Sequence, residues 1–229
     1  MNNTRRVFAF GSTALALAAT CIGFSARASD ASDARELVDK ATLTVGLLAA
    51  DKDFASLGPA LGKAKGVLVF PEVLKAGFVL GGSGGSGVLL VRDANTGDWG
   101  GPAFYTMGSA SLGLQAGASS AEMVMVINTQ KAIDSLYSNK VKLGGDVSVA
   151  LGPKGAAAGG SASADFIIYA KAKGAFAGIA VDGSVLDVRQ KLNAGFYGKP
   201  VTPVEILVKG EASNPEAANL KAALKQAAK

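Results

Sequence analysis

AGFVLGGSGGSGVLLVRD, residues 76–93, is a glycine-rich segment between two apolar runs. Its glycines have the G-x-G-x-x-G spacing of a dinucleotide-binding loop at Gly82–Gly87 and, around Ser83, the G-x-S-x-G spacing of a hydrolase nucleophile elbow. Both loops need a helix directly after the glycines. Here the glycines lead into Val88–Val91, an apolar run that predicts a strand. The segment therefore predicts a glycine-rich hairpin connection between two strands.

The composition predicts a compact, sheet-rich protein that lacks the commonest catalytic and metal-binding side chains. Of 229 residues, 49% are hydrophobic and 18% are charged, and 30 are glycine. The chain has no histidine and one cysteine, so it lacks the commonest acid–base catalyst and the ligands that zinc and copper prefer. We expect no cofactor. The turn Asp93–Asp98 is similar in spacing to a calcium loop but lacks the later glutamate. Calcium binding there, or a carboxylate-dependent hydrolase, stays open as an alternative.

Residues 1–28 have the features of an export signal. Two arginines precede the apolar run Val7–Phe24, and Ala26–Ala28 has the A-x-A pattern of a cleavage site, which predicts a mature chain from Ser29. An uncleaved anchor and lipidation at Cys21 are the alternatives. Cleavage would remove three arginines and no acid, leaving 20 basic against 18 acidic residues. This near balance gives no reason to expect a nucleic-acid partner.

The hydrophobic pattern predicts an α+β fold, and the chain length suits a single domain, residues 29–229. Apolar residues at helical spacing predict a helix over 33–50, and shorter patterns predict a middle helix over 130–138 and a C-terminal helix over 214–229. Between them, short apolar runs alternate with glycine-rich turns. Such spacing is typical of an antiparallel sandwich or a barrel-like sheet.

Five stretches along the chain carry a family resemblance. They are AKGVLVFPEVLKAGFVLGGSGGSGVLLVRD, WGGPAFYTMGSASLGLQAGASSAEMVMVINT, KLGGDVSVALGPKG, IIYAKAKGAFAGIAVDGSVL and NAGFYG. In order and spacing they resemble the SYLF domain family, a lipid-binding module of yeast actin-patch adaptors and of many exported bacterial proteins. The resemblance implies a domain core at about 33–207. The resemblance implies binding of acidic phospholipids through an N-terminal helical segment and nearby basic residues, without enzymatic activity. Actin is absent from a periplasm, so an actin function is not expected to transfer to an exported member.

The predicted lipid-binding residues are lysines that lie close to apolar residues, around the first predicted strand and on the C-terminal helix: Lys52, Lys63, Lys65, Lys75, Lys221 and Lys225. An apolar surface edged by lysines suits a membrane interface, although solvated turn and helix positions would look the same. Trp99, Phe104 and Tyr105 are a second cluster, which predicts either a groove for a lipid or partner or the core of the sheet.

The resulting functional hypothesis is a non-enzymatic domain that binds anionic phospholipid or a membrane surface. We expect it to be exported, and periplasmic or peripherally attached to the bacterial cell envelope. The alternative is a structural or protein-interaction module of the envelope, which would bind an envelope protein partner and no lipid.

Overall fold

The computed structural model describes residues 16–77, 80–112, 117–137, 140–152, 163–174, 181 and 183–229. Side chains are described from Ser29 onward, apart from those of residues 80, 111–112, 117 and 173–174. Cys21 and the predicted cleavage site therefore lie outside the described side chains. The signal segment and its processing stay predictions.

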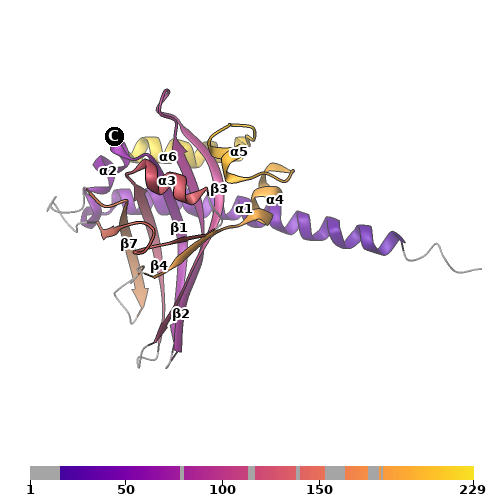
Figure 1. Ribbon diagram of the computed structural model, residues 1–229, viewed down its shortest axis with the longest axis horizontal. Coiled ribbons are helices and arrows are strands. Elements are labelled where there is room, and N and C mark those ends of the chain that lie inside the picture. The colour runs from indigo at the N-terminus through magenta and orange to yellow at the C-terminus, as the bar shows by residue number, and fades with distance from the viewer. Residues whose placement is uncertain are drawn as a thin grey trace, which may run out of the picture.

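The described strands form one eight-stranded sheet in the order β5-β8-β3-β2-β1-β4-β7-β6. They are β1 (Gly66–Gly77), β2 (Leu80–Arg92), β3 (Trp99–Leu112), β4 (Gly117–Ile127), β5 (Lys140–Lys142), β6 (Val149–Leu151), β7 (Phe166–Gly174) and β8 (Val185–Val188). Neighbouring strands are antiparallel except β6 and β7. The sheet curls into a half-barrel (Figure 1), which confirms the predicted α+β class and the barrel-like sheet.

Six α-helices and two short 3₁₀ helices accompany the described sheet. They are α1 (Ala16–Ala50), η1 (Lys52–Phe54), α2 (Leu57–Lys63), α3 (Gln130–Leu136), α4 (Gln190–Tyr197), α5 (Pro203–Leu207), η2 (Pro215–Ala217) and α6 (Ala218–Ala227). The predicted middle and C-terminal helices are confirmed. The N-terminal helix begins at Ala16 rather than at residue 33, because the alanine-rich residues before it also favour a helix. Figure 1 shows α1 running across the strands and continuing beyond the sheet.

The core lies on both faces of the sheet. Val67 and Val69 of β1 pack against α1, α2 and α6, on what we call the helix face. Leu68 and Phe70 point to the concave inner face, where α3, β5 and β8 enclose a second cluster. Because successive strand residues point to opposite faces, a continuous apolar run fits a strand covered on both sides.

The glycine-rich segment lies inside β2, so the prediction that it forms the hairpin connection is wrong. Its residues pair along β1 from Val91 opposite Gly66 to Gly81 opposite Gly77. A Cβ on Gly87 would lie 2.7 Å from the ring of Phe70. A Cβ on Gly85 would lie 2.3 Å from the carbonyl oxygen of Glu72, beside an irregularity in β1. These glycines are therefore needed because neighbouring atoms leave no room for a side chain.

Replacing Gly87 with valine is expected to lower the free energy of unfolding by roughly 1–3 kcal/mol, because the new side chain overlaps Phe70. Gly108→Ala is the control, since a Cβ there would have no atom within 4 Å, and we expect a change within about 0.5 kcal/mol. Urea unfolding measures both variants. Equal effects of the two substitutions would contradict the steric explanation.

Candidate functional site

Basic residues gather at the end of the sheet where β1 begins and β2 ends. The backbone N–H of Arg92 donates to the carbonyl of Lys65 at 2.8 Å, which places these residues side by side. The Arg92 guanidinium donates to the carbonyls of Leu61 at 2.8 Å and Gly62 at 3.3 Å, at the C-terminal turn of α2. Lys63, the last residue of α2, is exposed beside it. Positive charge at this helix end also suits the helix dipole.

The C-terminal helix brings two more lysines to the same end of the molecule. Helices α2 and α6 pack so closely that a Cβ on Gly58 would lie 2.8 Å from the carbonyl oxygen of Ala227 (Figure 1). The Lys225 ammonium lies 3.6 Å from a carboxylate oxygen of Asp98 in the β2–β3 turn. Burial lowers the pKa of Lys221, and the nearby Asp98 carboxylate opposes that effect.

We call this surface the cationic end: Lys63, Lys65, Arg92, Lys221 and Lys225. Four of its five residues are among the six lysines predicted from the sequence. The other two lie elsewhere: Lys52 is exposed in η1, at the C-terminal end of α1, and Lys75 lies near the far end of β1. Nine strand steps separate Lys75 from the first residue of β1, about 30 Å at 3.3 Å per step. The six lysines therefore do not form one surface.

The aromatic cluster does not line a groove. Trp99 and Phe104 belong to the core on the helix face, whereas Tyr105 points to the inner face, where its hydroxyl donates to the carbonyl of Leu136 at 2.6 Å. The exposed fraction of each of the three side chains is 7% or less. The groove hypothesis is wrong because successive residues of a strand point to opposite faces. All three side chains belong to the core, as the alternative interpretation predicted.

The Asp93–Asp98 turn has the geometry of a hydrogen-bonded turn. A carboxylate oxygen of Asp93 accepts from the backbone N–H groups of Asn95 and Thr96, both at 2.8 Å. These hydrogen bonds lower the pKa of Asp93. Within the described part of the chain, no group of three or more acidic, histidine or cysteine side chains is placed to hold a metal ion. The geometry therefore supports the local turn and adds nothing to the calcium alternative.

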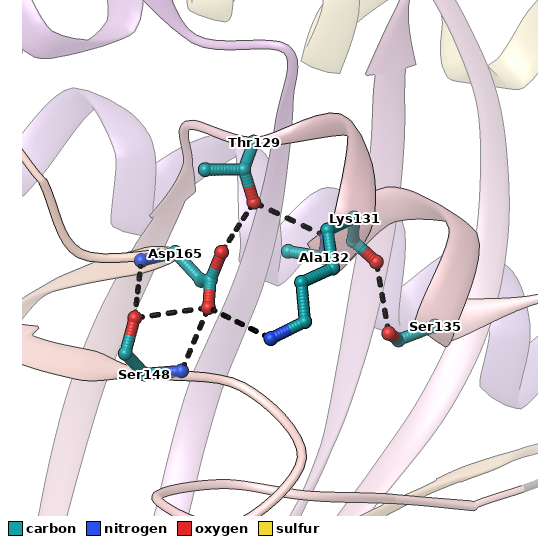
Figure 2. Close-up of polar contacts among 6 residues, drawn as sticks. All are labelled: Thr129, Lys131, Ala132, Ser135, Ser148 and Asp165. Carbon is teal, nitrogen blue, oxygen red and sulfur yellow. Dashed lines mark hydrogen bonds and ion pairs between the residues drawn. The ribbon is translucent and has the colours of Figure 1, made fainter.

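Asp165 is the one buried acidic residue in the described part of the chain, and it joins three elements (Figure 2). One oxygen accepts from the Thr129 hydroxyl, at the N-cap of α3. The other accepts from the backbone N–H and the hydroxyl of Ser148, at 2.8 and 2.9 Å, just before β6. The Lys131 ammonium lies 3.9 Å away. With both oxygens occupied, the carboxylate holds α3, β6 and β7 together rather than facing a cleft as a catalytic acid would.

Burial raises the pKa of Asp165, but the hydrogen bonds from Thr129 and Ser148, together with Lys131, outweigh it and leave the pKa below its ordinary value. The carboxylate therefore stabilises the fold fully above the ordinary pKa of about 4, and that stabilisation is lost as the pH falls through the lower native pKa.

Asp165→Asn is expected to lower the free energy of unfolding by about 1–3 kcal/mol at pH 7, with a smaller difference from the parent protein below about pH 4. Urea unfolding at both pH values tests this, with the exposed Asp134→Asn on α3 as the control. A deficit in Asp165→Asn that does not change with pH would show that the charge of the carboxylate is not what stabilises the junction.

A groove runs along α1 where the helix crosses β1 and β4. Leu43 and Leu47 of α1 form one wall, and Pro71 and Ala121 contribute to the strand side, around a volume of about 360 Å³. Sequence analysis missed this feature although a signal existed, because helical spacing places Leu43 and Leu47 on the side of α1 opposite the buried Val45 and Leu48. Among the residues that the structure describes, no helix combines the length and apolar character needed to cross a bilayer.

Residues 108–227, just over half of the chain, match the family described as "Ysc84: Las17-binding protein actin regulator". LAS seventeen-binding protein 3 of Saccharomyces cerevisiae is 38% identical over 154 residues, which cover 64% of this chain and 33% of that protein. Protein YSC84 of the same yeast is 36% identical over 166 residues, or 69% and 35% of the two chains. The human SH3 domain-containing YSC84-like protein 1 is 32% identical over 152 residues, or 64% and 44%.

The matched part of the chain thus covers 33% to 44% of the length of these curated relatives. No solved structure matches it. The match includes several of the stretches that carry the SYLF resemblance, from the second half of β3 to α6, and the family description names binding rather than a reaction. The chain belongs to the Ysc84 family, also called the SYLF domain family.

Proposed function

We propose that this protein is a non-enzymatic domain that binds anionic phospholipid surfaces through its cationic end. The observation that carries the proposal is that five basic residues, from α2, β2, α6 and the position directly before β1, lie at one end of the molecule. The neighbouring turn contributes only two carboxylates, Asp93 and Asp98. Each lysine or arginine near an anionic membrane contributes about 1 kcal/mol of attraction. A cluster of this size therefore suits a surface of lipid phosphates.

The members of the cationic end have different parts in this proposal. Lys63 and Lys65 are exposed, so their ammonium groups reach headgroup phosphates without rearrangement of the fold. The guanidinium of Arg92 bonds two backbone carbonyls and lies 4.6 Å above the Trp99 ring, so it contributes charge from a fixed position. A phosphate beside Lys221 would favour its protonated form and offset the effect of burial on its pKa.

A second candidate function is the binding of a protein partner. The family description and the name of the yeast relative both refer to binding of Las17. A domain that covers about a third of that relative can retain a binding surface without its other segments. The lipid proposal and this candidate differ in one respect: binding to protein-free vesicles supports the first alone.

Vesicle co-sedimentation tests the lipid proposal. The parent protein is expected to pellet with vesicles that contain phosphatidylserine and to remain in solution with pure phosphatidylcholine, and added salt should weaken the binding. Lys63→Gln with Lys65→Gln is expected to reduce binding roughly tenfold or more. The matched control is Lys142→Gln with Lys191→Gln, two exposed lysines on β5 and α4. Equal binding to both vesicle types, or equal losses in the two double variants, would refute the proposal.

We also propose that the chain is exported and acts at a cell envelope, with the mature protein starting at Ser29. The support is the charged start, the apolar run and the A-x-A pattern of residues 1–28. The expected result is an intact mass, for protein recovered from its own cells, that lacks these residues. A mass that includes Met1 would contradict cleavage, and a diacylated Cys21 at the N-terminus would identify a lipoprotein instead.

A further inference from the structure

Exposed leucines concentrate beside the groove along α1. The exposed fractions of Leu43 and Leu47 are 67% and 57%. Leu74, 56% exposed, lies two residues beyond Glu72 on the same face of β1. Among the described residues, five large hydrophobic side chains are more than half exposed, and three of the five lie beside this groove. A cluster of this kind marks an interaction site more often than scattered exposed leucines do.

The sheet beside the groove leaves these leucines uncovered. Leu74 has Gly84 of β2 and Ser120 of β4 as its cross-strand neighbours, and both are too small to shield it. Gly108, which pairs with Gly84 on β3, would have open space around a Cβ. The strands continue past the helices at this end of the sheet (Figure 1). The result is an unshielded leucine on the sheet next to a groove of about 360 Å³, within the usual range for binding pockets.

Two of the three charged residues that line the groove, Glu72 and Glu122, are acidic, and the third is Lys40. Lys40, which lines it, forms an ion pair with Glu36 at 2.7 Å, and the second carboxylate that acts on it belongs to Glu72 in the groove wall. Lys171 of β7 also has more than one acidic neighbour. It forms an ion pair with Asp51, and the carboxylate of Glu122 in the groove wall attracts it electrostatically. Lys40 is thus influenced by two carboxylates, and Lys171 by three because Asp53 also acts on it, in a chain whose formal net charge is +5.

These charges select among the possible occupants. Anionic headgroups would be repelled by an excess of carboxylates, so this surface does not suit the membrane that the cationic end would bind. A second copy in a two-fold dimer would place the same patch against itself, and the two acidic borders would face each other. A protein segment with apolar anchors and basic flanks satisfies both the exposed leucines and the carboxylates.

We propose that the groove along α1 is a docking site for an amphipathic protein segment with large apolar side chains flanked by lysine or arginine. The apolar side chains would pack on Leu43, Leu47 and Leu74, and the basic ones would lie against Glu72 and Glu122. This surface is separate from the cationic end, so it gives the domain a protein partner in addition to a lipid surface.

Fluorescence anisotropy with a labelled peptide tests the proposal. The probe is about twelve residues long, with leucines at i, i+3, i+4 and i+7 and lysines elsewhere, and its counterpart has glutamate at every lysine position. The full chain is expected to bind the lysine peptide at least about tenfold more tightly than the glutamate peptide. Glu72→Gln with Glu122→Gln should reduce this preference.

Two leucine variants locate the binding. Leu43→Ser with Leu47→Ser is expected to weaken binding of the lysine peptide at least about tenfold. Leu151→Ser is the control, since this leucine is 64% exposed on β6, away from the groove, and the substitution should leave binding unchanged. Both changes are at exposed positions, so thermal unfolding should show that the variants remain folded.

Four outcomes would overturn the proposal. Equal binding of the two peptides would exclude the role of charge, and equal losses in the Leu151 and Leu43/Leu47 variants would place the binding elsewhere. A dimer in sedimentation that dissociates in Leu43→Ser with Leu47→Ser would make a second copy the occupant. Loss of phosphatidylserine vesicle binding in that variant, with peptide binding intact, would make the groove a lipid surface. None of these results bears on the effect of Lys63 and Lys65 on vesicle binding.

Discussion

The structure depends on one strand that is buried on both faces. Over Gly66–Phe70, β1 is fully buried, and it pairs with β2 on one side and β4 on the other. Because alternate side chains point in opposite directions, such a strand needs two layers of cover. Helix α1 with α2 and α6 supplies one layer. The curl of the sheet, with α3 and the short edge strands, supplies the other. Beyond Pro71 the burial of β1 alternates, and the groove along α1 lies where this double cover ends, whereas the cationic end lies at the opposite end of the buried stretch.

Much of this fold can be predicted from sequence because the apolar pattern is local. The helices and the main strands follow from periodicity, and α5 could also have been found, since Thr202 and Glu205 form a capping box around Pro203. The glycines of β2 were misplaced for a different reason. Glycine has low strand propensity and favours turns, but in β2 it is required by the closeness of Phe70. That contact comes from tertiary packing, which no local pattern records.

The candidate surfaces show the same limit. Lys65 and Lys75 are close in sequence, yet an extended strand carries them far apart, whereas Arg92 is distant in sequence and adjacent in space because β1 and β2 are antiparallel. The groove along α1 depends on which residues of a long helix project past the sheet. Leu43 and Leu47 lie on the side of α1 opposite the buried Ala41, Val45 and Leu48. Their exposure therefore follows from helical spacing, but the strands that they border could not be assigned before the crossing position of α1 was known.

The two proposed surfaces have opposite charge, and this constrains how they would work together. Lys65, directly before β1, and Glu72 on β1 are seven residues apart, about 23 Å at 3.3 Å per extended residue. If the cationic end rests on an anionic membrane, the acidic groove lies to the side and above it. A segment with apolar anchors and basic flanks is itself attracted to anionic lipid, so the membrane raises its concentration near the groove while competing for the same side chains. Release of the segment from lipid and its capture by the groove would then be governed by the same electrostatic attraction, and both would weaken together as the salt concentration rises.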